Sequence, residues 1–155
     1  MAMSALFKKL NFKGQRSILI CQAPSSFDAE CSAMEEVCEV RRQIHAGESI
    51  QFALVFVTSL LQIAAAARDV FPLLADDAVC WMAYPKGSSK RYTCEFNRDN
   101  GWQALGDLGY EPVRQVAVDE DWSALRFRKV EKIKTFTRSS TMALTETGKK
   151  RATRQ

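Results

Sequence analysis

The sequence lacks the short motifs that mark several large classes of enzyme. It contains no GxGxxG loop, no GxxxxGK[ST] loop and no GxSxG turn, which excludes the dinucleotide fingerprint, the Walker phosphate loop and the α/β-hydrolase nucleophile. Its single histidine is His45, so any Ser–His or Cys–His nucleophile would depend on that one position. We place His45 at a helix end beside Gly47, where it acts as a solvated cap residue or, alternatively, as a general base.

Cysteine pairs with metal-binding spacing are also absent. The chain has five cysteines, an odd number, with no CxxC pair and no secretory signal, so we predict reduced thiols, no metal site and a cytoplasmic protein. The longest apolar stretch, residues 52–67, contains Thr58, Ser59 and Gln62 and is too short to span a bilayer. We therefore expect no membrane segment.

Net positive charge is absent outside the C-terminal part of the chain. The net charge is +4, but residues 129–155 hold eight Lys and Arg against two Glu, so the preceding part is slightly acidic. With 46% apolar and 26% charged residues, the composition is that of a folded domain. We predict a single α/β domain over residues 1–136 and a basic, flexible tail over 137–155. No basic helical stripe accompanies the tail, which argues against nucleic-acid binding.

Hydrophobic patterning predicts an alternation of strands and helices. Residues 51–57 carry apolar side chains on both faces, and residues 122–130 alternate as an antiparallel strand does. An Asp76-Asp77 turn is expected before the third strand, and residues 92–96 are read as a short extended piece. The predicted strands are 17–21, 51–57, 78–84, 113–118 and 122–130, and the predicted helices are 27–44, 59–74 and a short one near 102–108.

Three segments carry a resemblance to a known group of proteins. They are LADDAVCWMAYPK at residues 74–86, Ser89-Lys90, and DWSALRFR at residues 121–128. Over roughly residues 6–136 the chain resembles small bacterial proteins of a family whose function is unknown. The resemblance implies a shared fold and brings no activity with it.

A second, more distant resemblance concerns residues 52–86, a strand, a helix and a strand that ends in Tyr-Pro-Lys. This segment and the final hairpin are similar to class I methyltransferases. The resemblance implies a three-layer, Rossmann-like sandwich of about five strands in the order 1-2-3-5-4, with 2-1-3 as the alternative. The chain departs from that family at Cys21-Gln22-Ala23-Pro24, which has no glycine, and in lacking a following strand with a ribose-binding acid. No cofactor is therefore expected.

The order 1-2-3-5-4 has a consequence for the second face of the sheet. Right-handed connections that wind one way would place the connecting helices on one face, yet the strand 51–57 is apolar on both. We expect the other face to be covered by the amphipathic segment 3–12, by C-terminal residues, or by a second copy of the chain in a homodimer.

Polar side chains follow each of the three parallel strands. Ligands of open α/β sheets bind beyond the carboxyl ends of the strands, and hydroxyls, helix N-termini and cations together favour an anion. The predicted ligand-binding residues are Gln22, Ser25, Ser26, Thr58, Ser59, Lys86, Ser88, Ser89, Lys90 and Arg91. The alternative is that the serines and threonine cap helices and the cations solvate a loop.

The sequence favours a binding function over a catalytic one. Asp119, Glu120 and Asp121 are adjacent carboxylates, which we interpret as a hairpin turn in preference to a cation site. We predict a non-catalytic binding or adaptor module whose partner is a small anion or a protein. The alternative is a degenerate methyltransferase-like or other transferase-type enzyme that uses the same edge.

Overall fold

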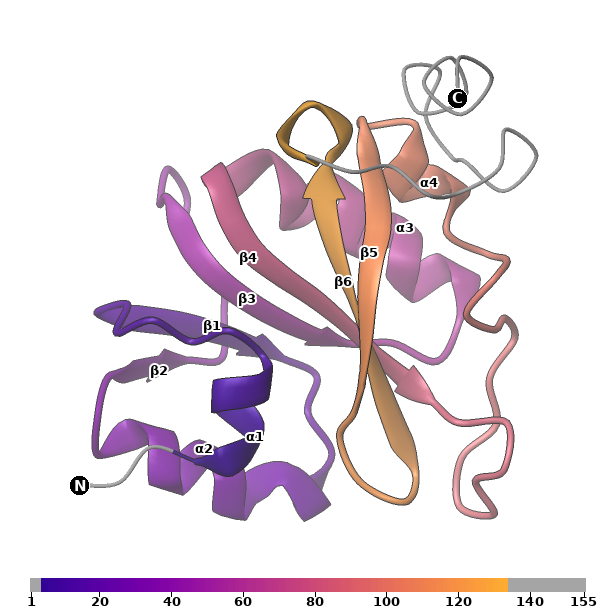
Figure 1. The fold of residues 1–155 in the computed structure, drawn as a ribbon, viewed down its shortest axis with the longest axis horizontal. Helices are drawn as coiled ribbons and strands as arrows, with labels where there is room; N and C mark the ends of the chain where they lie inside the picture. Colours follow the sequence, from indigo (N-terminus) through magenta and orange to yellow (C-terminus); the bar gives the residue numbers. More distant parts are fainter. Residues whose placement is uncertain (1–3, 134–155) are drawn as a thin grey trace.

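The computed structural model describes residues 4–133. A six-stranded sheet in the order β2-β1-β3-β4-β6-β5 lies at its centre (Figure 1). The first four of these strands pair in parallel, and β6 and β5 complete the sheet as an antiparallel hairpin. The strands are β1 (Ser17–Cys21), β2 (Glu39–Arg41), β3 (Ile50–Phe56), β4 (Leu74–Pro85), β5 (Tyr110–Ala117) and β6 (Trp122–Lys129).

The fold class and the predicted strand order are confirmed. The order 1-2-3-5-4 of the five predicted strands corresponds to β1-β3-β4-β6-β5. The unpredicted β2 adds the order β2-β1-β3 at the parallel edge, which is the 2-1-3 arrangement of the alternative. The molecule is an α/β protein with a mostly parallel sheet and an antiparallel hairpin. β3 lies inside the sheet, and its Phe52 and Leu54 are buried on one face, whereas Ala53 and Val55 are buried on the other. Burial on both faces explains its continuous apolar run.

Helices cover both faces of the sheet. The α-helices are α1 (Ala5–Lys9), α2 (Asp28–Glu35), α3 (Leu60–Asp69) and α4 (Gln103–Gly106), and 3₁₀ turns lie at Ser25–Phe27, Phe71–Leu73 and Val130–Lys132. α1 and α2 lie on one side of the sheet, and α3 and α4 lie on the other (Figure 1).

The expectation that the connecting helices share one face was wrong, and β2 gives the reason. The chain leaves β1 through α2 toward β2 at one edge, and leaves β3 through α3 toward β4 in the opposite direction. Right-handed connections in opposite directions place the two helices on opposite faces. α2, together with Phe7 and Leu10 of the predicted amphipathic segment, covers the second face of β3, and Trp81 Nε1 donates to the Leu10 carbonyl at 2.8 Å. That face of β3 is not open to a second copy.

The helix predicted over residues 27–44 ends much earlier, at Glu35. The Met34 carbonyl accepts hydrogen bonds from the amides of both Val37 and Cys38, which closes the last turn. The chain then forms β2, whose Val40 lies in parallel register with Ile18. The strand judged to be missing after β1 is therefore present, although it is only three residues long.

Two further local predictions need correction. Asp76 and Asp77 do not form a turn, because β4 begins at Leu74 and accommodates them in an irregularity where Asp77 adopts a φ of 56°. Residues 92–96 form a loop in place of the expected extended piece.

The tail predicted for residues 137–155 lies outside the described residues. Within residues 4–133, no helix is long and apolar enough to cross a membrane.

Candidate functional site

The carboxyl end of β3 leads directly into the N-terminus of α3. Side chains of the protein itself accept hydrogen bonds from the amides at this helix end. Ser59 Oγ accepts from the Gln62 amide at 3.2 Å, and the Thr58 amide donates to Gln62 Oε1 at 2.6 Å. Glu95 Oε1, from a distant loop, accepts from the Leu60 amide at 2.8 Å. A carboxylate at a helix N-terminus occupies the place an external anion would take. Thr58 and Ser59 therefore cap α3, as the alternative interpretation held.

The carboxyl end of β1 lines only a small space. Gln22 adopts a left-handed φ of 61° and borders a cavity of about 150 Å³ with Cys21, Val55 and Ala66. Burial, followed by the nearby Glu48 carboxylate, raises the pKa of the Cys21 thiol to about 11. The cavity lining is mainly apolar. Ser25 and Ser26 belong to the following 3₁₀ turn, are exposed and do not line this cavity.

The loop after β4 is held against the β5–β6 turn. Ser89 Oγ donates to Asp121 Oδ1 at 2.9 Å and accepts from the amides of Arg91 and Tyr92 at 3.2 Å. The Lys86 amide donates to the Asp121 carbonyl at 2.8 Å. These contacts fix the start of the loop, whereas Ser88, Lys90 and Arg91 are exposed.

A cavity of about 510 Å³ lies between this loop and the sheet. We call it the loop cavity. Its volume is within the range of small-molecule sites, roughly 300–1,000 Å³. It is lined by Tyr84, Pro85, Lys86, Gly87, Ser89, Tyr92, Thr93, Cys94, Phe96, Asn97, Arg98, Gln115 and Ser123.

The loop cavity has a polar side built from three strands and the loop. Gln115 Nε2 donates to the Tyr84 hydroxyl at 2.8 Å, and Arg98 Nη1 donates to Gln115 Oε1 at 3.5 Å. Ser123 of β6 is only 5% exposed, and within residues 4–133 its hydroxyl makes no side-chain hydrogen bond. A cavity-lining hydroxyl that makes no such bond is able to bind a ligand or water.

The lining charges of the loop cavity are of one sign. Lys86 and Arg98 contribute two cations, and none of the described lining residues is Asp, Glu or His. Three neighbouring carboxylates have partners of their own. Glu95 caps α3, Asp121 binds Ser89, and Asp99 pairs with Arg98 Nε at 3.4 Å, which neutralises part of the charge of that cation. The cavity is therefore suited to an anion. Its Tyr84 and Cys94 are protonated at neutral pH, because burial raises the pKa of Tyr84 to about 12 and also raises the pKa of Cys94.

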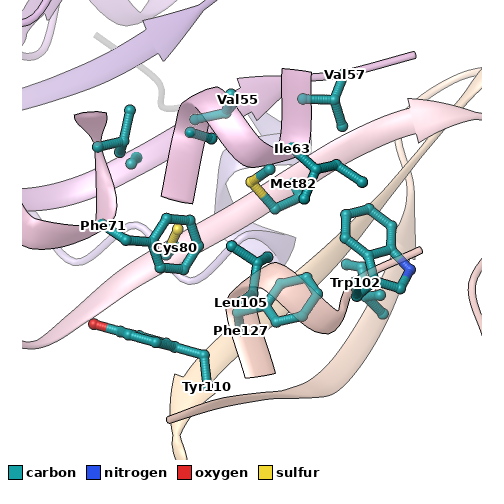
Figure 2. Packing of buried hydrophobic residues seen from close by; sticks show 14 of the residues in the cluster. Val55, Val57, Ile63, Phe71, Cys80, Met82, Trp102, Leu105, Tyr110 and Phe127 are labelled. Carbon is teal, nitrogen blue, oxygen red and sulfur yellow. The ribbon is translucent and has the colours of Figure 1, made fainter. Parts of the chain in front are cut away.

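An aromatic cluster packs against the lining of the loop cavity. Trp102 stacks edge-on against Tyr84 and Phe96 and lies 5.2 Å from the Phe127 ring centroid. Its Nε1 donates to the Asn97 carbonyl at 2.8 Å, which ties the loop to the core. Figure 2 shows Trp102 and Phe127 packed together beside α4. The far end of the loop thus has a rigid anchor.

The ten predicted ligand-binding residues do not meet at one site. Lys86 and Ser89 line the loop cavity, and Gln22 lines the smaller one, but the other seven line neither cavity. Arg98, Gln115 and Ser123 were missed. A signal for Ser123 exists in the sequence, because it is a polar residue on the face of β6 that also carries Leu125 and Phe127.

The acidic segment before β6 is a turn. Asp119 Oδ1 accepts from the amides of Asp121 and Trp122, both at 2.8 Å, as the turn interpretation predicts. In the described part of the chain, no group of three or more His, Cys, Asp or Glu residues could hold a metal ion. His45 is exposed in the β2–β3 loop, because the helix expected to carry it ends before it.

Comparison with known proteins identifies neither a family nor a ligand. No family model matches the chain, and no curated protein matches it. The likeness to an uncharacterised bacterial family thus stays a prediction.

Several solved structures are similar in fold. One is a protein of the NADB-Rossmann superfamily from Streptococcus agalactiae, with a TM-score of 0.48 and 12% identity over 83% of this chain and 69% of that one. Another is the N-methyltransferase NodS from Bradyrhizobium japonicum with S-adenosyl-L-homocysteine, with a TM-score of 0.46 and 15% identity over 73% and 66%. The LepI complex with SAM has a TM-score of 0.49 and 12% identity, and this chain spans 39% of its length. Such likenesses concern the fold alone.

Proposed function

We propose that this protein is a binding module for a small organic anion, which occupies the loop cavity. The observation that supports this proposal most strongly is the cavity lining, whose described residues include two cations, no carboxylate and the Ser123 hydroxyl. A guanidinium and an ammonium in one lining suit a carboxylate or phosphate group. Gln115 and Ser123 provide neutral hydrogen-bonding groups beside it.

The body of the ligand is expected to be planar. Tyr84, Tyr92 and Phe96 contribute aromatic rings to the lining, and Pro85 adds apolar surface. Aromatic side chains favour flat partners that stack on or meet the edge of a ring. An aromatic carboxylate or aromatic phosphate therefore fits the cavity better than an aliphatic one.

The lining favours binding over turnover. No imidazole or carboxylate is among the described lining residues, and the raised pKa values of Tyr84 and Cys94 leave both without charge at pH 7. General-base catalysis requires a group whose pKa lies near the working pH. The protonated groups of the cavity instead serve as hydrogen-bond donors.

A thermal-shift and calorimetric titration with benzoate and phenyl phosphate tests the proposal. We expect saturable binding that raises the melting temperature, with about 2.7 kcal/mol of stabilisation at 100 times the dissociation constant. The Lys86→Gln/Arg98→Gln double variant should lose at least tenfold in affinity, since charge-assisted hydrogen bonds contribute about 1.5–3 kcal/mol.

The matched control is Lys90→Gln/Arg91→Gln, which removes the same charge from exposed positions outside the cavity lining. It should retain the wild-type affinity. Equal loss in both double variants would show that net charge and not the cavity determines binding. Absence of binding by either anion to the wild-type protein would count against the proposal.

A second candidate is a transferase-type enzyme that uses S-adenosylmethionine. It is favoured by the crevice between the carboxyl ends of β1 and β3, where the connections depart to opposite faces of the sheet. The residues there do not fit that cofactor well. The cavity there has a volume of only about 150 Å³. Gln22 occupies the position where a glycine would let the protein backbone approach the cofactor. β2 ends in Arg41, followed by Arg42, and not in the acidic residue that would bind the ribose.

S-adenosylmethionine in the same thermal-shift experiment separates the two candidates. We expect no saturable stabilisation by this cofactor. A saturable shift that disappears in Gln22→Trp, a variant that fills the crevice, would place the transferase candidate first.

A further inference from the structure

Three arginines lie together on the face of the sheet opposite the loop cavity. In β6, Ser123 lines the loop cavity, and Leu125 and Phe127 pack on the same face. Arg126 and Arg128 alternate with these residues and therefore face the other way. Arg114 of β5 is the direct antiparallel partner of Arg126. β5 forms the edge of the sheet away from β1 and β2, beside which α1 and α2 lie in Figure 1.

The cluster has more positive charge than its neighbours neutralise. Arg128 donates to Asp77 Oδ1 through Nη2 at 2.7 Å and through Nε at 3.2 Å. Arg114 and Arg126 make no ion pair within residues 4–133, and Arg126 Nε is buried without a hydrogen-bond partner. Glu111 stands in register opposite Arg128, but it is fully buried and takes part in interactions of its own.

This arrangement opposes folding unless an anion joins it. Like charges placed directly opposite each other on neighbouring strands destabilise a sheet. Burial, together with Arg128 and Arg114, lowers the pKa of the Arg126 guanidinium, and the opposing influence of Asp77 does not reverse this. A buried guanidinium N–H without a partner also has a desolvation cost.

We propose that Arg114 and Arg126, with Arg128 beside them, bind the phosphoryl group of a small phosphate monoester. The two arginines that lack an acidic partner carry two positive charges, which match the charge of about −1.5 to −2 on a phosphate monoester at pH 7. A single carboxylate would neutralise only one of them. Guanidinium groups also donate in a planar fork that suits phosphate oxygens. This site is independent of the loop cavity, from which the sheet separates it.

Side-chain ¹H–¹⁵N NMR of the arginine Nε–H groups tests this site in the full chain at low ionic strength. Methyl phosphate is the probe, with inorganic phosphate, dimethyl phosphate, acetate and a short single-stranded oligonucleotide as comparisons. We expect saturable shifts of the Arg126 and Arg114 signals with methyl phosphate, and affinities at least tenfold weaker for the monoanions dimethyl phosphate and acetate. Inorganic phosphate binding as tightly as methyl phosphate would mean that the ester group is not recognised, and would overturn the assignment to a monoester.

Variants of the two arginines test whether methyl phosphate binding depends on these residues. Arg114→Gln and Arg126→Gln should each weaken methyl phosphate binding at least tenfold, whereas Arg16→Gln, an exposed control, should not. Because Arg126→Gln relieves repulsion, its melting temperature without phosphate should equal or exceed the wild-type value. A loss of folding in that variant would contradict the proposed repulsion.

Other results overturn the proposal. Methyl phosphate shifts that survive both variants but vanish in Lys86→Gln/Arg98→Gln would move the phosphate to the loop cavity. Tighter binding of the oligonucleotide than of methyl phosphate would assign the surface to nucleic acid. Absence of saturable binding by either phosphate would remove the site.

Discussion

The ends of β3 and β4 are adjacent in the sheet and carry similar polar residues, yet only one of them borders a large cavity. At the end of β3, Thr58 and Ser59 bind Gln62 as the chain turns into α3, and Glu95 supplies the negative charge. At the end of β4, the chain forms a long loop before its next helix, and Lys86 and Ser123 border open space. Polar residues at a strand end are available to a ligand only where the following helix does not use them.

The largest expected effects come from removing a buried aromatic ring from one or the other hydrophobic cluster, which lie on opposite faces of the sheet. Trp102→Ala removes the ring beneath the loop cavity, and Phe7→Ala removes an equally buried ring beneath the other face. Each should lower the free energy of unfolding by about 3–5 kcal/mol in urea denaturation. Benzoate binding at low temperature, where both variants are folded, should be lost only in Trp102→Ala, because Trp102 Nε1 holds the loop at Asn97. Equal loss in Phe7→Ala would show that the cavity depends on global stability alone.

Alkaline pH distinguishes the small cavity at the end of β1 from the loop cavity at the end of β4 by their titrating groups. Cys21 has its pKa raised from 9.0 to about 11, and Tyr84 has its pKa raised from 10.0 to about 12. The unfolded state then releases its proton first, so each stabilising contribution is complete below the unfolded pKa and is lost as pH rises through the folded pKa. Each group lowers the free energy of unfolding by at most about 1.4 kcal/mol per pH unit within its window.

Urea titrations across the alkaline range should show which residue causes the loss of stability in each pH range. Relative to wild type, Cys21→Ala should remove part of the decline between pH 9 and 11, and Tyr84→Phe should remove part of it between pH 10 and 12. Unchanged pH profiles in both variants would mean that these groups are not buried as described.

The smallest effects test the capping of α3. Ser59→Ala and Glu95→Ala should each lower the free energy of unfolding by about 1 kcal/mol, because each removes an acceptor from an amide at the helix N-terminus. Ser88→Ala, an exposed serine in the loop after β4, should change it by less than about 0.5 kcal/mol. If Ser88→Ala were as costly as Ser59→Ala, the distinction between the two strand ends would fail.

The sequence predicts the parallel strands because burial on both faces leaves a continuous apolar run, as in Phe52 to Val57. It does not reveal β2, because Glu39–Arg41 is a short, partly exposed edge strand that is held by pairing with β1 and not by its own pattern. Without β2, the direction of the first connection is unknown, and so is the face on which α2 lies.

The candidate site was predictable only where it follows a strand in sequence. Lys86 and Ser89 come directly after β4, so the rule for strand ends identifies them. Arg98, Gln115 and Ser123 come from a loop and two later strands, and only the closing of the antiparallel hairpin brings them to the same cavity. The sequence did not predict the capping of α3 by Glu95 either, because this contact joins residues 35 positions apart.

A backbone ¹H–¹⁵N NMR titration with benzoate tests the central claim most directly, because it reports the amides at the ends of β1, β3 and β4 at once. The amides of Gly87, Ser89 and Ser123, which line the loop cavity, should shift saturably, while those of Gln22 and Thr58 stay in place. Shifts concentrated at Gln22 and Thr58, with Ser123 unmoved, would contradict it.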